Sequence, residues 1–129
     1  MLIYCCADLI FATRVRAAAE DANLTSRPVR NPDMLAARLN QIDDGKPNAP
    51  VSLFIADLEN PESLNLITQL RAWETDQPEH APIPVVAFGP HVMTDALQAA
   101  SDAGATRVMT RGSFTSALPT LLSEATPQT

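Results

Sequence analysis

The chain has 129 residues, 46% of them hydrophobic and 19% charged, which predicts one globular domain and leaves little room for a second. Its formal net charge of -6 at pH 7 opposes nucleic-acid binding, because that function needs clustered Lys and Arg. The start of the chain has no basic region or cleavage site, and no apolar stretch approaches the ~20 residues of a membrane span. We therefore expect a soluble, cytoplasmic protein that contacts neither nucleic acid nor membrane.

The first half of the chain predicts two strand–helix units. Residues 2–6 are a short apolar run, and a helical face follows it, made of Phe11, Val15, Ala18, Ala19 and Ala22. A weak strand candidate at residues 27–30 precedes Asn31-Pro32, a helix cap followed by a first-turn proline. The apolar stripe of this second helix is Leu35, Leu39 and Ile42. Adjacent cysteines in the first strand, Cys5 and Cys6, suggest reduced buried thiols rather than a disulfide framework.

The second half predicts three more units. Residues 43–50 are rich in turn formers, and residues 51–56 are apolar enough for a buried strand. A helix starts at Asn60-Pro61, and its predicted inward face is Leu66, Ile67, Leu70 and Trp73. After a polar loop at 74–83 come a strand at 84–88, a helix at 93–103 that ends at Gly104, and a strand at 105–110. The apolar face of the final helix is Phe114, Ala117, Leu118, Leu121 and Leu122.

Alternating strands and helices define the fold class. Parallel strands need right-handed crossovers, so helices cover both faces of the sheet. We predict a single α/β domain at residues 1–124, with a doubly wound parallel sheet of flavodoxin-like order 2-1-3-4-5. Residues 125–129 are predicted to be a flexible tail.

Asp57 is the most informative residue. It ends the apolar run at 51–56, and Pro61 follows four residues later. The carboxyl ends of parallel strands face the crevice where ligands normally bind in open α/β sheets. The sequence therefore places a carboxylate where a functional group would lie.

From Leu2 to about Glu124 the chain resembles the CheY-like receiver domain of two-component response regulators. The resemblance depends on Asp57 with Pro61, on Ala103-Gly104-Ala105 before the fifth strand, and on Phe114 after it. It implies a bacterial signalling module of a phosphorelay, with an aspartate phosphoacceptor, two acidic residues that hold Mg²⁺, a hydroxyl residue after the fourth strand and a lysine after the fifth.

At the matching positions the chain departs from that pattern. Cys6 and Ala7 replace the acidic pair, Gly89 replaces the hydroxyl residue, and Arg111 replaces the lysine. Without a metal that neutralises the phosphoryl oxygens, Asp57 is a poor acceptor. We therefore expect a degenerate receiver (a pseudo-receiver) that binds partner proteins, is not an enzyme, and uses no metal or other cofactor.

Two arrangements of Arg111 stay open in the sequence. Its guanidinium could form an ion pair with Asp57 and hold that carboxylate ionised. In the other arrangement Arg111 points to solvent and Asp57 caps a neighbouring helix.

Two alternative functions also stay open. In the first, Asp8 replaces one ligand of the acidic pair and Asp57 remains a phosphoacceptor, although Mg²⁺ tolerates displaced ligands badly. In the second, Cys6 is a phosphotransfer nucleophile whose thiolate is stabilised by a helix amino terminus, as in the phosphocysteine domains of sugar transport systems. The segment after Cys6 lacks the glycine and hydroxyl residues of a phosphate cradle.

The two histidines do not predict a metal centre. His91 lies after the fourth strand, where it could tune a cleft or bind a ligand, and a surface loop position is the commoner role. His80 lies in the polar loop and has no partner at metal-ligand spacing.

The resemblance also implies a partner surface, formed by the fourth helix, fifth strand and fifth helix. The residues predicted on it are Met93, Leu97, Arg107, Met109 and Arg111. The expected partners are a histidine kinase, an output protein or a second copy of the chain.

Overall fold

A computed structural model describes residues 1–43, 46–47 and 49–125. Its strands are β1 (Leu2–Cys5), β2 (Ser26–Pro28), β3 (Ile42–Asp43), β4 (Lys46–Pro47), β5 (Leu53–Asp57), β6 (Val85–Gly89) and β7 (Arg107–Thr110). Its helices are α1 (Leu9–Asp21), α2 (Pro32–Leu39), α3 (Ser63–Thr75), α4 (Thr94–Asp102) and α5 (Arg111–Ala125).

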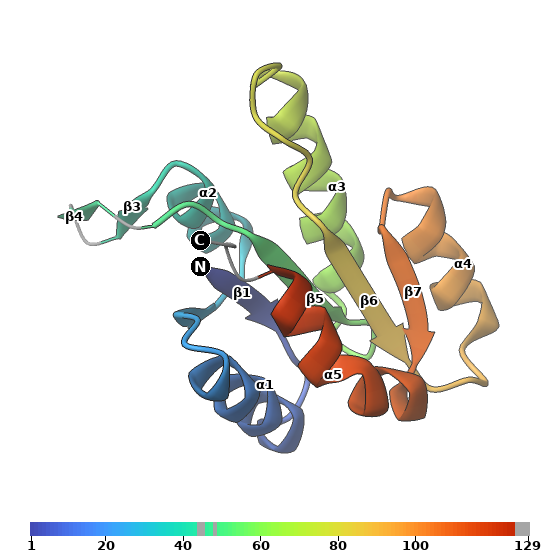
Figure 1. The fold of residues 1–129 in the computed structure, drawn as a ribbon. Coiled ribbons are helices and arrows are strands. Elements are labelled where there is room, and N and C mark those ends of the chain that lie inside the picture. The colour runs from blue at the N-terminus through green and yellow to red at the C-terminus, as the bar shows by residue number, and fades with distance from the viewer. Residues whose placement is uncertain (44–45, 48, 126–129) are drawn as a thin grey trace.

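The main sheet has five strands in the order β2-β1-β5-β6-β7, and all neighbouring pairs are parallel. Counted along the chain, these five strands have the order 2-1-3-4-5, so the predicted flavodoxin-like topology is confirmed. β3 and β4 form a separate antiparallel pair that extends away from the sheet (Figure 1).

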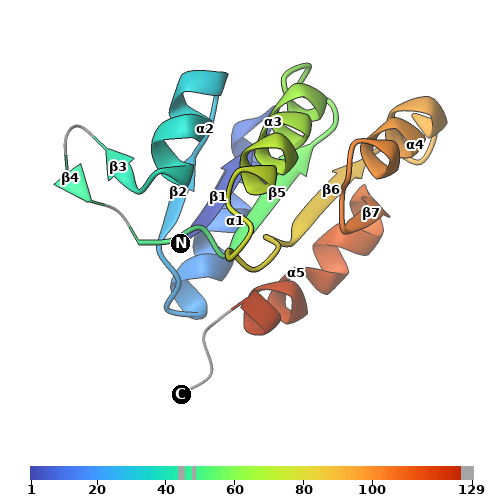
Figure 2. The same ribbon diagram turned by 90° about the horizontal axis from the view of Figure 1, so that it is seen from above.

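The helices cover the sheet in two layers. α1 and α5 lie on one face, and α2, α3 and α4 lie on the other (Figure 2). Successive side chains of each buried strand point to opposite faces. In β5, for example, Phe54 and Ala56 join the cluster under α2, α3 and α4, whereas Leu53 and Ile55 join the cluster under α1 and α5. The two clusters are called here the α3-side core and the α5-side core.

Local chemistry explains where the first two helices begin. Asp8 caps α1, because its Oδ1 accepts a hydrogen bond from Phe11 N–H at 2.9 Å. Asn31 caps α2 in the same way through Met34 N–H at 2.8 Å, and Pro32 occupies the first turn. Both caps follow strands at the same edge of the sheet.

The predicted elements and the structure differ mainly between α2 and β5. Ile42 was predicted on the apolar stripe of the second helix, but α2 ends at Leu39 and Ile42 lies in β3 with a relative exposure of 53%. The prediction was wrong because Gln41 adopts a φ of 60°, which turns the chain out of the helix. The predicted tail lies outside the described residues except for Ala125, which ends α5.

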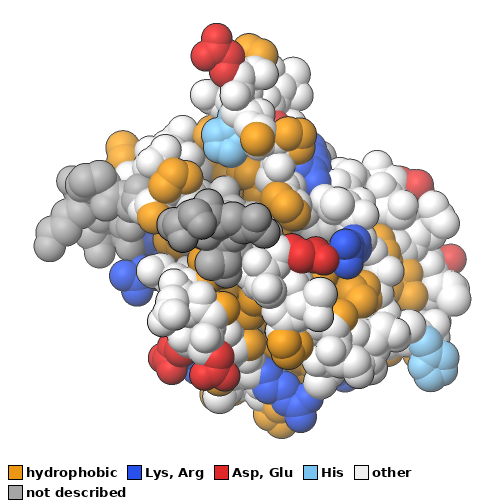
Figure 3. Space-filling model, viewed as in Figure 1, with side chains coloured by type: hydrophobic (Ala, Val, Ile, Leu, Met, Phe, Trp, Pro, Cys, Tyr) orange, Lys and Arg blue, Asp and Glu red, His pale blue; other side chains and the backbone are white. Residues whose placement is uncertain are grey.

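The charged surface is mixed. On the uncovered part of the face in Figure 3, basic side chains form small separate groups among apolar and acidic ones. No helix of the described residues is long and apolar enough to cross a bilayer.

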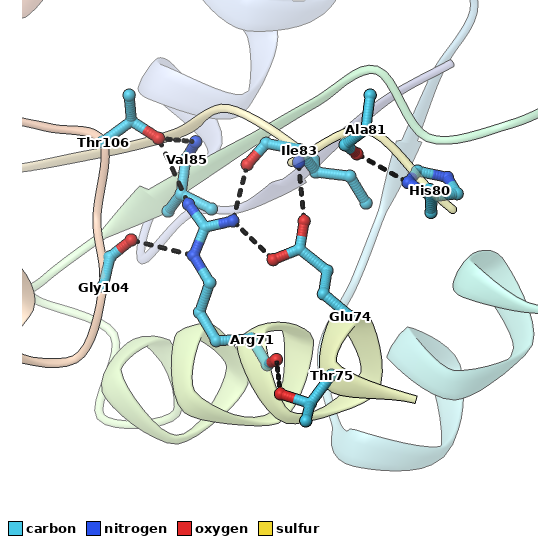
Figure 4. A network of polar contacts seen from close by, with 9 residues as sticks. All are labelled: Arg71, Glu74, Thr75, His80, Ala81, Ile83, Val85, Gly104 and Thr106. Atoms are coloured by element: carbon cyan, nitrogen blue, oxygen red, sulfur yellow. Dashed lines mark hydrogen bonds and ion pairs between the residues drawn. The ribbon is translucent and has the colours of Figure 1, made fainter. Parts of the chain in front are cut away.

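Arg71 of α3 joins three segments on the α3 side of the sheet (Figure 4). Its Nε donates to the carbonyl of Gly104 at 2.9 Å, and its Nη1 donates to the carbonyl of Ile83 at 2.9 Å. Nη1 also pairs with Oε1 of Glu74 at 2.7 Å, and Glu74 Oε2 accepts from Ile83 N–H at 2.6 Å. One side chain thus fixes the approach to β6 and the turn before β7.

Candidate functional site

Asp57 is the last residue of β5 and lies opposite Phe88 in the register with β6. Its relative exposure is 0%, so the carboxylate is enclosed by the loops that follow β1 and β5. This is the carboxyl edge of the sheet, as the sequence predicts. A buried carboxylate without solvent contact needs hydrogen-bond donors from the protein.

Backbone donors satisfy both oxygens of Asp57. Ala7 N–H donates to Oδ2 at 2.9 Å, and Glu59 N–H donates to Oδ1 at 3.0 Å. Ser63 Oγ also donates to the carbonyl oxygen of Asp57, at 2.5 Å. Buried polar atoms are normally hydrogen-bonded, and here the donors come from two loops that meet at the strand ends. The carboxylate is therefore built into the loop structure.

Arg111 pairs with two other carboxylates. Its Nη2 lies 3.4 Å from Oδ2 of Asp8 and 3.2 Å from Oε2 of Glu59. Its guanidinium carbon also lies 4.5 Å from the centre of the Phe11 ring, within cation–π range. The start of α5 is thus joined to the loops after β1 and β5.

These contacts overturn both arrangements predicted for Arg111 and Asp57. Arg111 neither pairs with Asp57 nor points freely to solvent, because Asp8 and Glu59 hold it. Asp57 does not cap a helix, because its two donors lie in loops. The physical reason is that the backbone N–H groups already satisfy Asp57, which leaves the more exposed carboxylates for the guanidinium.

The carboxylates around Asp57 already have protein partners in the described residues. Cys6 and Ala7 carry no oxygen ligand at the positions of the acidic pair. Asp8, the predicted substitute ligand, uses Oδ1 to cap α1 and Oδ2 to pair with Arg111. Within residues 1–43, 46–47 and 49–125, no group of three or more His, Cys, Asp or Glu side chains could hold a metal ion. A hard cation such as Mg²⁺ requires several oxygen ligands, and it would have to displace these partners of Asp8, Asp57 and Glu59.

The raised pKa of the Cys6 thiol opposes a nucleophilic role for this residue. Burial, together with the nearby negative charge of Asp57, raises the pKa of the Cys6 thiol to about 12. Burial also raises the pKa of Cys5, whose side chain is enclosed in the α3-side core. A nucleophilic cysteine needs a lowered pKa, because the thiolate is the reactive form.

The predicted switch position, Gly89, is the last residue of β6 and carries no hydroxyl group. Gly89 is buried, and a β-carbon there would lie 3.3 Å from Cβ of Leu58. His91 is exposed, as expected for a surface loop residue. His80 is also exposed, and its ring lies edge-on to Trp73 with the ring centres 5.2 Å apart.

The predicted partner surface surrounds β7, the edge strand between α4 and α5 (Figure 1). Arg107 is exposed and lies 3.4 Å from Glu124. The other predicted members, Met93, Leu97, Met109 and Arg111, are half-buried. Leu97 packs against the α3-side core and Met109 against the α5-side core, so the predicted surface extends around β7 from one face of the sheet to the other.

Sequence reasoning missed two members of the site, Glu59 and Phe11. Glu59 supplies both a backbone donor to Asp57 and a carboxylate to Arg111. Phe11 was predicted as a core residue only, and its ring also packs beneath the guanidinium. The position of Glu59, two residues after Asp57 in the same loop, was the available signal.

Comparisons with solved structures identify the fold. The receiver domain of NtrX from Brucella abortus has a TM-score of 0.70 at 16% identity, covering 97% of each chain. A response regulator from Thermotoga maritima has a TM-score of 0.68 at 19% identity, covering 96% of this chain and 94% of its own. The phosphorylated cyanobacterial phytochrome response regulator RcpA has a TM-score of 0.67 at 17% identity, and the match covers 95% of this chain and 89% of RcpA.

No family model matches the sequence, and no curated protein matches it either. At these identities the structural matches establish the shared fold over nearly the whole chain, and they do not transfer a function.

Proposed function

We propose that this chain is a receiver-like signalling module that acts by binding partner proteins in the cytoplasm, without turnover and without Mg²⁺-dependent phosphorylation of Asp57. The observation that carries the proposal is the state of Asp57. Its side chain is fully buried, and backbone N–H groups occupy both of its oxygens.

The surroundings of Asp57 also support the proposal. A phosphoryl donor brings negative charge to a site where Asp8 and Glu59 are already close, so a cation has to neutralise the approach. The only cationic group bound to those two carboxylates among the described residues is Arg111, which is fixed between them. Phosphorylation would therefore require two loops to open before a donor could reach Asp57.

The partner surface that we propose is the one around β7. Unpaired backbone groups of an edge strand can bind another chain, and the flanking Met93, Leu97 and Met109 add partly exposed apolar area. The partner is a histidine kinase, an output protein or a second copy of the chain that buries this face.

An amide NMR titration with Mg²⁺ and then beryllofluoride tests the proposal. The amide signals of residues 57, 89 and 111 are expected not to shift when Mg²⁺ and beryllofluoride are added, either in the native chain or in Asp57→Asn. The double variant Cys6→Asp/Ala7→Asp serves as the responsive control, because it adds two carboxylates beside Asp57 and is expected to gain Mg²⁺-dependent shifts.

Large shifts in the native chain that disappear in Asp57→Asn would overturn the proposal and favour a residual phosphoacceptor. Sedimentation velocity of the same samples tests for a second copy as partner. A homodimer would give a concentration-dependent sedimentation coefficient.

A further inference from the structure

A pocket lies beside the Asp57 site, at the carboxyl ends of β1 and β2. Its volume is about 210 Å³, and its walls come from the loops after β1, β2 and β5 and from one face of α1. The polar side chains that line it are Asp8, Arg16, Arg30 and Asn60, and the apolar part includes Tyr4, Leu9 and Pro28.

The two arginines of this pocket have unused donors. Arg30 makes no ion pair or side-chain hydrogen bond within the described part of the chain, and Arg16 reaches only Thr13 Oγ1, at 3.4 Å. Both side chains are exposed and line the same cavity. In a chain of net charge -6, two guanidinium groups without an ion pair line one cavity and give it local positive charge.

Asp8 is the acidic side chain among the lining residues, and its single negative charge offsets only part of the two guanidinium charges. Both oxygens of Asp8 are used, by the cap of α1 and by Arg111. Asn60 accepts from Glu62 N–H through Oδ1, which leaves its Nδ2 group available as a donor. The pocket therefore presents donors from two guanidinium groups and one amide.

The position of the pocket also suggests a ligand site. The chain runs from β1 outward to β2 and then crosses back to β5 on the other side of β1, so the switch point of this sheet lies between β1 and β5, and ligands of doubly wound sheets bind outside the carboxyl ends at such a point. The pocket borders that point, because residues of the loops after β1 and β5 line it, and it extends from there towards β2, apart from the enclosed carboxylate of Asp57.

We propose that this pocket binds a small phosphate monoester through Arg16, Arg30 and Asn60. A guanidinium pairs with phosphate oxygens through two parallel hydrogen bonds, and a phosphate ester carries close to two negative charges at neutral pH. The volume is below the ~300 Å³ at which drug-sized sites begin, so the ligand has one phosphate and a short organic part against Leu9 and Pro28.

The experiment is an amide NMR titration of the full chain with glycerol phosphate, inorganic phosphate and malonate, at constant ionic strength. The test variant is Arg16→Gln/Arg30→Gln. The control variant is Arg14→Gln/Arg27→Gln, which removes the same charge from exposed arginines that do not line the pocket. Folding of each variant is checked by its amide spectrum before titration.

The expected result is saturable shifts of Ala7, Leu9, Val29 and Asn60 with glycerol phosphate. We expect the test variant to lose at least about tenfold in affinity, because charge-assisted bonds are removed, and the control variant to keep it. Tighter binding of glycerol phosphate than of inorganic phosphate would place the organic part in the pocket; the reverse would assign the site to the free ion.

Three results would overturn the proposal: shifts that do not saturate, equal loss in both variants, or malonate binding as tightly as either phosphate. Because no Mg²⁺ is present and Asp57 is not altered, failure here leaves the proposed function of the Asp57 site unaffected.

Discussion

Arg111 connects three separate pieces of the carboxyl edge through one side chain. It bridges Asp8 at the start of α1 and Glu59 in the loop after β5, and it packs on Phe11. About a third of the side chain is exposed, so water and salt weaken its two ion pairs. The cation–π contact between Arg111 and Phe11 depends on the planar guanidinium lying over the ring, and salt weakens it less than the ion pairs.

Arg111→Ala is expected to lower the free energy of unfolding by about 1–2 kcal/mol, from two partly exposed ion pairs and one cation–π contact. Arg111→Lys should restore part of the loss, because it keeps the charge without the planar stack. Urea unfolding at low and high salt measures both variants, and the effect of the alanine change should shrink at high salt.

Arg14→Ala is the matched control for that measurement. Arg14 also lies over Phe11, at 5.7 Å, but forms no ion pair among the described residues. Equal losses for the two alanine variants, or no salt dependence for Arg111→Ala, would contradict the bridging role.

At the scale of whole elements, the junction between α4 and β7 depends on Gly104. Its φ is +109°, a conformation that side chains rarely adopt, and a β-carbon there would lie 2.9 Å from Cγ of Arg71. The predicted helix-ending role of Gly104 is confirmed by that dihedral angle. The contact with Arg71 adds a second reason for glycine.

Gly104→Ala is expected to cost about 1–3 kcal/mol of unfolding free energy from backbone strain, and to displace Arg71 from the carbonyls of Gly104 and Ile83. Thermal unfolding measures the cost, and the amide signals of Ile83 and Val85 report the displacement. Gly112→Ala is the control, because a β-carbon at Gly112 meets nothing within 4 Å. It should leave stability unchanged or slightly raised, and a loss equal to that of Gly104→Ala would argue against strain at the junction.

At the scale of the whole molecule, the sheet and its helices could be predicted because their signals are local. Continuous apolar runs mark β5 and β6, which are buried at every position, and apolar residues three and four apart mark the inward faces of α3 and α5. The position of Asp57 at a strand end followed from the same pattern. The prediction was wrong for Ile42, where a single left-handed residue redirects the chain.

The polar contacts could not be predicted, because they join residues far apart in sequence. Arg111 and Asp8 are 103 positions apart, and Arg71 and Gly104 are 33 apart. No spacing rule selects such partners, and the charge of Arg111 was equally compatible with Asp57. Only the fold decides which carboxylates remain available after backbone donors have satisfied the buried one.

The two cores share their strands, so we expect them to unfold together. Phe88 stacks on Phe114 in the α5-side core, with ring centres 4.1 Å apart, while its neighbour Ala87 lies in the α3-side core. Trp73, the only tryptophan of the chain, packs against the α3-side core. Its fluorescence therefore reports from the face opposite to Phe88.

Phe88→Leu is expected to lower the free energy of unfolding by about 1–3 kcal/mol, because it loses stacked aromatic area in a close-packed core. Urea unfolding followed by Trp73 fluorescence and by far-UV circular dichroism should give the same lowered midpoint. Ile67→Val, on the Trp73 side, should cost about 0.5–1.5 kcal/mol and also shift both signals together. If Phe88→Leu moved the circular dichroism midpoint and left that of Trp73 unchanged, the two layers would fold separately, and a partner bound at β7 could not influence the Asp57 loops through the sheet.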